Sequence, residues 1–223
     1  MLETKNLGFW YKNQSETLFK DVNLQFEAGK MYTILGKSGS GKTTFLSLIS
    51  ALDAPKEGEI LYQTENIAKI GLTHFRRHHL AIVFQAYNLL TYMTAYQNVS
   101  SALEISGVKT ADKRAFIIES LKSVGITEDL IHKKIAQLSG GQQQRVAIVR
   151  AMITGADIIV ADEPTGNLDE ETGREMIALF EKIAHEQDKI VILVTHDKDI
   201  AKRSDVTYEL KDRVFHIRSE DTA

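Results

Sequence analysis

The segment that most restricts how this chain can fold is the glycine-rich stretch Gly36–Thr44, which reads GKSGSGKTT. It follows the apolar run Met31–Leu35 and precedes a segment in which apolar residues recur at helical spacing: Phe45, Leu48, Ile49 and Leu52. A strand, a glycine-rich turn and a helix in this order form a loop whose backbone N–H groups point inward, beside a helix N-terminus that attracts negative charge. The pattern predicts a phosphate-binding loop.

Two side chains of this loop have expected roles. Lys42 should reach the β- and γ-phosphates of a nucleotide, and the Thr43 hydroxyl should ligate Mg²⁺. The alternative is a glycine-rich turn without a ligand. Because the strand and the helix supply the context that the motif requires, we predict a nucleotide site.

An acidic pair follows another apolar run, Ile158–Ala161. Asp162 is expected to bind Mg²⁺ directly or through water, as strand-terminal aspartates do beside phosphate-binding loops. Glu163 projects beyond the strand end and is the candidate general base that polarises the attacking water. The alternative is a solvated acidic pair in a loop.

Other residues are candidates because they stand at the ends of predicted strands. His196 follows the apolar run Ile190–Val194, so it should reach the sheet edge that carries the loop and touch the γ-phosphate. Gln85 follows "LAIVF" and has an amide suited to Mg²⁺ or to the attacking water. Tyr11 is suited to stack on an adenine ring, although Trp10 beside it could take that place, since neighbouring strand residues face opposite sides. The remaining histidines are interpreted as surface residues: His74, His78, His79, His132, His185 and His216.

Composition limits the classes of protein that this chain can represent. With 223 residues, 43% of them hydrophobic, it can bury a substantial core. The net charge of −3 gives no reason to expect a nucleic acid partner, and the absence of cysteine excludes disulfides and thiolate metal sites. The N-terminus lacks the apolar stretch of a secretion signal, and no apolar run approaches the ~20 residues that cross a bilayer. We therefore expect a soluble chain.

The predicted fold is α/β. The runs "DIIVA" and "KIVILV" are apolar on both faces, as in covered parallel strands, and an amphipathic helix lies between them. Val22, Leu24 and Phe26 alternate as in a half-buried edge strand. The segment from Ala86 to Met152 is predicted to be mostly helical, and the last strands, near Val206–Leu210 and Val214–Ile217, to form a hairpin.

A second phosphate-competent turn stands at Leu138–Gln142, which reads LSGGQ and opens a helix with a Val146, Val149 and Ile153 stripe. With it, the order of motifs resembles the ATP-binding-cassette (ABC) ATPases, the nucleotide-binding subunits of ABC transporters, over essentially the whole chain. In that comparison GKSGSGKTT is the Walker A loop, LSGGQ the signature, "IIVADE" Walker B and "GNLD", with Asp169, the D-loop. The resemblance also makes Gln85 the Q-loop glutamine and His196 the switch histidine.

The resemblance implies a single ABC ATPase domain over residues 1–223. Its fold would combine a P-loop NTPase (RecA-like) core with a mostly parallel sheet, an N-terminal antiparallel β subdomain and an inserted α-helical subdomain. The core and β subdomain would span about 1–86 and 153–223, and the helical subdomain about 87–152.

The resemblance also implies ATP and Mg²⁺ as ligands. Glu163, His196 and Gln85 would act in catalysis, and Thr43, Gln85 and Asp162 would bind the metal. The implied nucleotide-contacting residues are Tyr11, Gly36, Lys37, Ser38, Gly39, Ser40, Gly41, Lys42, Thr43, Thr44, Gln85, Ser139, Gly140, Gly141, Gln142 and Asp169. In this family two cassettes pack head to tail, so Ser139–Gly141 would complete the site of a second copy.

Within the family the chain resembles the branch of lipoprotein-release, macrolide-efflux and bacitracin-resistance ATPases. That branch implies an integral membrane permease as partner, a homodimer of ATPase subunits, and a cytoplasmic position on the inner face of the membrane. The segment Tyr87–Tyr96 is rich in aromatic and apolar residues and is the candidate permease contact, with helical-subdomain core as the alternative. A non-transport ABC ATPase, such as a division regulator or a cofactor-assembly factor, is the alternative function.

Overall fold

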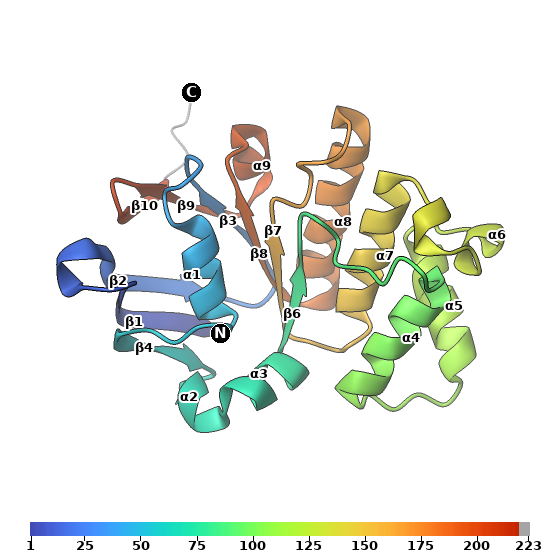
Figure 1. The fold of residues 1–223 in the computed structure, drawn as a ribbon, viewed down its shortest axis with the longest axis horizontal. Coiled ribbons are helices and arrows are strands. Elements are labelled where there is room, and N and C mark those ends of the chain that lie inside the picture. Colours follow the sequence, from blue (N-terminus) through green and yellow to red (C-terminus); the bar gives the residue numbers. More distant parts are fainter. Residues whose placement is uncertain (219–223) are drawn as a thin grey trace.

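The computed structural model describes residues 1–218 and arranges its strands in two sheets (Figure 1). The smaller sheet is antiparallel, in the order β2-β1-β4-β5, and its strands are β1 (Leu2–Trp10), β2 (Thr17–Phe26), β4 (Glu57–Tyr62) and β5 (Glu65–Asn66). The larger sheet has the order β10-β9-β3-β8-β7-β6. Its strands are β3 (Lys30–Leu35), β6 (Leu80–Val83), β7 (Ile158–Asp162), β8 (Ile190–Thr195), β9 (Val206–Lys211) and β10 (Val214–Arg218). Only β10 runs antiparallel to its neighbour in this sheet.

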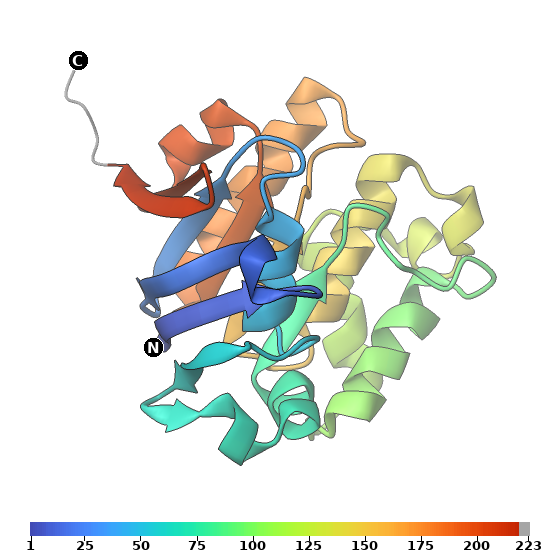
Figure 2. The same cartoon turned by 60° about the vertical axis from the view of Figure 1, so that its left-hand side comes forward.

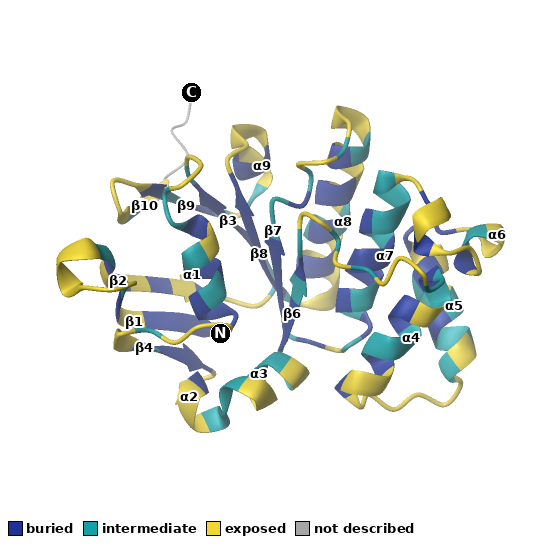
Figure 3. Cartoon of the chain, in the orientation of Figure 1, coloured by how far each residue is buried: buried dark blue, intermediate teal, exposed yellow. Residues whose placement is uncertain are grey.

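The central strands are apolar on both faces because each face packs into a different core. Ile158 and Val160 point into the core shared with the antiparallel sheet, while Ile159 and Ala161 point into the core on the opposite face. Helix α1 (Lys42–Ile49) fills the first core, and α8 (Glu170–Gln187) covers the second (Figure 2). The central strands are accordingly buried along their length (Figure 3).

A helical layer with its own core stands beside the parallel sheet. Its helices are α4 (Ala95–Ser106), α5 (Lys113–Ser123), α6 (Glu128–Ile131) and α7 (Gly140–Met152). Helix α7 belongs to two cores, because Val146 and Val149 pack among α4 to α6 whereas Ala147 and Ile148 pack against the sheet. This helix therefore joins the helical layer to the sheet (Figure 1).

Short helices complete the chain. They are α2 (Ile67–Ile70), α3 (Leu72–His78), α9 (Lys198–Arg203) and the 3-10 turns η1 (Gln14–Glu16) and η2 (Ile135–Gln137). None of the helices in residues 1–218 is both long and apolar enough to cross a membrane.

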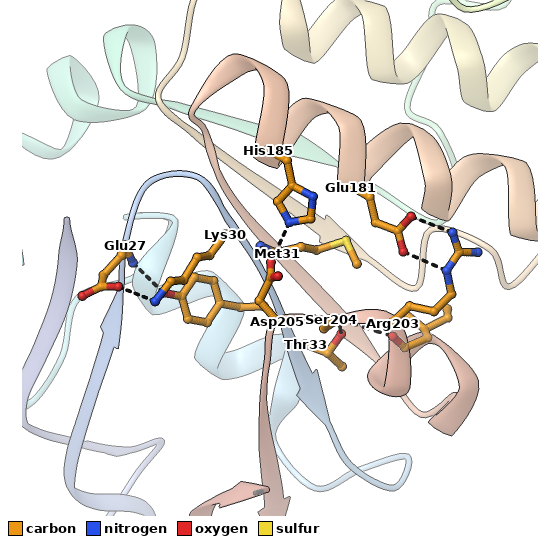
Figure 4. Close-up of polar contacts among 11 residues, drawn as sticks. Glu27, Lys30, Met31, Thr33, Glu181, His185, Arg203, Ser204 and Asp205 are labelled. Atoms are coloured by element: carbon orange, nitrogen blue, oxygen red, sulfur yellow. Dashed lines mark hydrogen bonds and ion pairs between the residues drawn. The ribbon is translucent and has the colours of Figure 1, made fainter. Parts of the chain in front are cut away.

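Polar contacts tie α8 and α9 to β3 at the sheet edge away from the glycine-rich loop (Figure 4). The Asp205 carboxylate accepts from the backbone N–H of Met31 at 2.7 Å and lies 2.9 Å from His185 Nε2. Arg203, the last residue of α9, makes a two-pronged contact with the Glu181 carboxylate of α8 at 2.7 and 2.8 Å. These contacts join the C-terminal end of α9 and the residues after it to α8 and β3.

Most predicted elements are confirmed, with three corrections. The final hairpin and the alternating edge strand β2 are present. Leu52 was expected in the stripe of the helix after the loop, but α1 ends at Ile49 and Leu52 is 51% exposed. Residues 86–94 precede the first helix of the helical layer and form loop and turn. His79 is partly buried and lies 3.3 Å from the Asp157 carboxylate, so it is no simple surface residue.

Candidate active site

The glycine-rich loop joins β3 to α1 and leaves the start of that helix uncapped by any side chain. Gly41 is the N-cap residue, with a φ of 106° that only glycine adopts readily, and no side chain within residues 1–218 caps the first helical N–H groups. A Cβ on Gly41 would also lie 3.0 Å from the Phe19 ring. The helix start therefore presents free N–H donors at the end of a parallel strand, where an anion is favoured.

Lys42 is folded back over this loop. Its Nζ donates to the carbonyl oxygens of Gly36 at 2.7 Å and Lys37 at 3.1 Å, and lies 3.9 Å from Glu163 Oε1. The Lys42 side chain is only 8% exposed. A buried positive charge surrounded mostly by carbonyl dipoles is placed to attract phosphate oxygens.

A cleft of about 960 Å³ opens above the loop. We call it the P-loop cleft. It is lined by most of the loop between residues 35 and 44, by Tyr11 and Leu18, and by Gln85, Asp162, Glu163, His196, Lys198 and Glu209. The fold thus gathers at one sheet edge side chains that the sequence spreads over almost two hundred positions.

The loop also fits a phosphate because some of its hydrogen-bonding groups have no partner within residues 1–218. Ser40 Oγ is buried and has no hydrogen-bond partner among residues 1–218. Gly36 cannot carry a side chain, because a Cβ there would lie 2.8 Å from this hydroxyl and 2.9 Å from the Leu210 carbonyl oxygen. A buried, unpaired hydroxyl beside free backbone N–H groups is a donor set suited to phosphate oxygens.

Glu163 is held at the cleft by a strained backbone and by two hydrogen bonds. Its φ of 45° lies in the left-handed region, which costs about 1 kcal/mol for a residue with a Cβ. The Thr195 hydroxyl donates to Glu163 Oε2 at 3.1 Å, and His196 Nδ1 lies 3.0 Å from Oε1. Since an ionised carboxylate only accepts, this contact assigns the proton to His196 Nδ1. The Glu163 carboxylate is thereby oriented toward Lys42.

Asp162 stands beside Thr43 at the same edge. Burial raises the pKa of Asp162, the neighbouring Glu163 charge raises it further, and Lys42 and a hydrogen bond from the Thr43 hydroxyl oppose the rise. Carboxylate, hydroxyl and amide oxygens are the ligands that Mg²⁺ takes, usually together with substrate phosphates. Among residues 1–218 no group of three or more His, Cys, Asp or Glu side chains could hold a metal alone. Thr43, Asp162 and Gln85 therefore fit Mg²⁺ that arrives with a nucleotide.

Of the two adjacent aromatic residues, Tyr11 is the one that lines the P-loop cleft. It is 64% exposed, its hydroxyl hydrogen-bonds to that of Thr44, and Phe9 meets its ring edge-on at 5.2 Å. One ring face remains accessible for a planar group. Trp10 does not line the cleft.

The signature turn lies outside the P-loop cleft. Ser139 is the N-cap of α7, where its hydroxyl accepts from Gln142 N and Gln142 Oε1 accepts from Ser139 N at 3.0 Å. A Cβ on Gly141 would lie 2.7 Å from the Thr172 methyl group, so this turn packs on the start of α8. Asp169 caps α8 by accepting from the Thr172 N–H and hydroxyl, which lowers its pKa. Of the residues predicted to contact the nucleotide, Ser139–Gln142 and Asp169 therefore lie outside the P-loop cleft.

Sequence reasoning missed Glu209 and Lys198, two polar residues that line the cleft, and Thr195, which contacts Glu163 from outside the lining. Glu209 lines it because β9 pairs with β3 in parallel, with Glu209 opposite Leu35. Lys198 enters it from the start of α9, and Thr195 orients Glu163 from the end of β8. Thr195 and Lys198 flank His196 closely enough to have been found. Glu209 carries no local signal, since only strand register brings it there.

The segment Tyr87–Tyr96 divides into buried and exposed parts. Leu89 packs against two cores, while Tyr92 is 68% and Leu90 42% exposed. Buried Asn98 fixes Leu90 by accepting from its N–H at 2.8 Å and donating to its carbonyl oxygen at 3.1 Å. The segment therefore presents apolar side chains on a rigidly held loop.

Comparison with known proteins gives one consistent result. The family model described as ABC transporter matches residues 19–166. An uncharacterized ABC transporter ATP-binding protein of Bacillus subtilis, YclH, is 55% identical over 98% of this chain and 96% of its own length. The macrolide export ATP-binding/permease protein MacB of Photorhabdus laumondii is 41% identical over 99% of this chain. This chain spans only 34% of that protein's length.

Solved structures agree in fold. The dimeric structure of MJ0796, described as a bacterial ABC transporter cassette, is 38% identical with a TM-score of 0.84, over 96% of this chain and 95% of that one. A second structure of the same cassette, described as a dimeric post-hydrolysis state bound to ADP and Pi, has 37% identity, a TM-score of 0.86 and 98% coverage of both chains. The related MJ0796 sequence is from Methanocaldococcus jannaschii.

Proposed function

The chain belongs to the ABC transporter family, and on that premise we propose that it is the ATP-binding and ATP-hydrolysing subunit of a transporter. One observation carries the proposal. Lys42, Glu163 and His196, from three different elements, converge on the P-loop cleft. A phosphate-binding cation beside an oriented carboxylate is what hydrolysis of a phosphoanhydride requires.

In the proposed reaction Glu163 is the general base. Its carboxylate accepts a proton from the water that attacks the γ-phosphorus, while Thr195 and His196 hold it in place. The Lys42 ammonium and the N–H groups at the start of α1 stabilise the charge on the phosphate oxygens. Tyr11 stacks on the adenine ring.

Mg²⁺ is proposed to bind with the nucleotide at Thr43, Asp162 and Gln85. Bound there, the cation neutralises charge on the β- and γ-phosphates. The raised pKa of Asp162 supports this assignment, because a second positive charge would relieve the repulsion between Asp162 and Glu163. Gln85 contributes a neutral amide oxygen and needs no proton loss.

We further propose that the active unit is a head-to-tail dimer in which each Ser139–Gln142 turn completes the partner's site. The proposal is supported by the position of this turn outside the chain's own cleft and by the dimeric structures of a related cassette. Asp169 would lie at the same interface. A nucleotide held by both subunits stabilises the dimer by mass action, and hydrolysis weakens it.

A mixing experiment tests this arrangement. Lys42→Ala removes the phosphate cation, and Ser139→Arg blocks the turn that serves the partner, so each variant alone should hydrolyse ATP very slowly. A heterodimer of the two retains one intact site. Random pairing of equal amounts should therefore restore about a quarter of the wild-type rate. Failure of the mixture to recover activity, or full activity of either variant alone, would contradict the shared site.

The proposed partner is an integral membrane permease that contacts the segment Tyr87–Tyr96. Exposed Tyr92 and Leu90 on a fixed loop support this, since aromatic and apolar residues concentrate at interface centres. The related macrolide export proteins carry ATP-binding and permease parts in one chain, of which this chain spans about a third. We place this protein at the inner face of the cell membrane, with export, lipid or lipoprotein extraction, or resistance to antimicrobial peptides as its process.

A further inference from the structure

Helix α7 reaches the loop that carries Gln85 through one arginine. Arg150, in the last turn of α7, donates from Nη2 to the Tyr87 carbonyl oxygen at 2.9 Å and from Nη1 to that of Asn88. The two acceptors are successive, so one planar guanidinium spans both peptide units. These contacts join parts of the chain more than sixty positions apart.

The clamped residues have an unusual backbone. Tyr87 has a φ of 60° and Asn88 a φ of 48°, both in the left-handed region that residues with a Cβ seldom occupy. Asparagine adopts this region more readily than most residues, whereas tyrosine does not, so contacts around the turn must offset the backbone cost at Tyr87. The guanidinium supplies such a contact, because it bonds to both carbonyl oxygens only while they point the same way.

The charge on Arg150 has no ionic partner within residues 1–218. Burial lowers the pKa of Arg150, and no neighbouring charge contributes to that shift. Its positive charge is therefore balanced by backbone dipoles alone. Arg145, five residues earlier on the same helix, differs, since it pairs with Glu175 and also donates to the Val124 carbonyl oxygen at 3.0 Å.

Two further contacts hold the loop next to the Arg150 hydrogen bonds. The Gln85 carbonyl oxygen accepts from Asn167 Nδ2 at 3.0 Å, in the segment between β7 and α8. The Tyr87 hydroxyl lies near the start of α7, 3.2 Å from the position of a Cβ on Gly140. Gln85 thus enters the P-loop cleft from a turn that Arg150 bonds to the last turn of α7, and the Tyr87 hydroxyl of that turn lies close to the start of the same helix.

We propose that Arg150 is a positioning residue for Gln85: by holding the Tyr87–Asn88 turn against α7, it makes the place of Gln85 in the cleft depend on the helix that begins at Ser139. The inference rests on the proposed function of Gln85 as a ligand of Mg²⁺ or of the attacking water. Arg150 itself is not among the residues that line the P-loop cleft.

The test uses Arg150→Lys, because an ammonium keeps the charge but cannot span two carbonyl oxygens with a planar fork. We expect kcat for ATP hydrolysis to fall about ten-fold, which corresponds to the weak end of the range for one hydrogen bond from a charged group, with KM changed less than about two-fold. ATP binding, followed by the fluorescence of Trp10, the single tryptophan, should stay near that of the wild type. Arg145→Lys is the matched control and should leave kcat unchanged.

A double-mutant cycle separates positioning from general stability. If Arg150 acts through Gln85, adding Arg150→Lys to Gln85→Ala should lower kcat no further. An equal loss in both backgrounds, an unchanged kcat in Arg150→Lys, or an equal loss in Arg145→Lys would each overturn the inference. Asn88→Val provides an independent variant for the case that Arg150→Lys does not fold. It keeps the arginine, changes an exposed side chain and disfavours the left-handed backbone, so it should lower kcat in the same way.

Hydrogen exchange gives a readout that needs no hydrolysis. In Arg150→Lys the amides of residues 85–90 should exchange faster than in the wild type, while Arg145→Lys should leave them unchanged. Unchanged exchange in Arg150→Lys would overturn the inference. If the wild type had no ATPase activity but Arg150→Lys still exchanged these amides faster, the proposed function would be refuted, whereas the role of Arg150 in holding the Tyr87–Asn88 turn would stand.

Discussion

Two helices of this chain begin in a glycine-containing turn suited to an anion, and the two turns differ in how their backbone N–H groups are capped. Gly41, the N-cap of α1, has no side-chain cap within residues 1–218. The Lys42 side chain and the carboxylates of Asp162 and Glu163 line the same cleft. Helix α7 starts at Ser139 with a reciprocal cap, in which Ser139 and Gln142 satisfy each other's backbone N–H groups. No charged side chain of the P-loop cleft lies at the second turn.

The difference separates a turn whose free donors face the chain's own P-loop cleft from a turn that, in the proposed dimer, would serve the cleft of a second copy. At α1 the Lys42 side chain and the glycine-rich loop face one cleft, and the buried Ser40 hydroxyl of the same loop has no hydrogen-bond partner among residues 1–218. At α7 the turn is stable by itself, and only the N–H groups of its glycines remain for a ligand on another subunit. Two similar helix starts can thus differ in whether their N–H groups are capped, and variants at the two turns should affect hydrolysis and stability differently.

The largest effect is expected from Glu163, the carboxylate that faces the turn before α1. Glu163→Gln removes the base and keeps the shape of the side chain, with one acceptor oxygen in place of two, so ATP hydrolysis should fall at least about 100-fold while nucleotide binding persists. Size-exclusion chromatography with ATP should then show a lasting dimer. Asp157→Asn, next to the other end of β7, is the control and should retain hydrolysis. Wild-type turnover in Glu163→Gln would remove this residue as the base.

A smaller effect is expected from the cap of the second turn. Ser139→Ala should lower the free energy of unfolding by about 1 kcal/mol, since it deletes one N-cap hydrogen bond. Thr94→Ala removes the same kind of reciprocal cap, formed with Gln97 at α4, and should cost a similar amount. Chemical denaturation measures both. If the second turn serves the partner's nucleotide, only Ser139→Ala should also slow hydrolysis, and an equal slowing in Thr94→Ala would contradict that role.

The smallest effect concerns charge in the P-loop cleft. Because the pKa of Asp162 is raised on folding, its ionised form costs stability above that pKa, and the cost disappears as pH falls toward the ordinary carboxyl value. Asp162→Asn should therefore melt at a higher temperature than the wild type at neutral pH without nucleotide. The difference should shrink on acidification. A wild-type chain that is the more stable of the two at neutral pH would show that the Thr43 and Lys42 contacts outweigh burial.

Local sequence predicted the elements well where a short pattern carries the physics. Glycines after an apolar strand predicted the loop at Gly36–Thr44, and two-sided apolar runs predicted the parallel strands β7 and β8. The helical stripe failed at Leu52, because α1 ends before it. Residues 86–94 also gave no reliable local signal, since the left-handed turn at Tyr87 and Asn88 is held by a distant arginine.

The sequence by itself determined which residues can carry the chemistry, because side-chain type and spacing along a strand, turn or helix are local properties. Only the tertiary structure decided which of them share a cleft. Strand register placed Glu209 beside the loop, and the packing of α7 on two cores kept Ser139 away from it. Both outcomes depend on contacts between distant segments, whose free energies come from burial and hydrogen bonding across the whole fold and leave no mark on neighbouring residues.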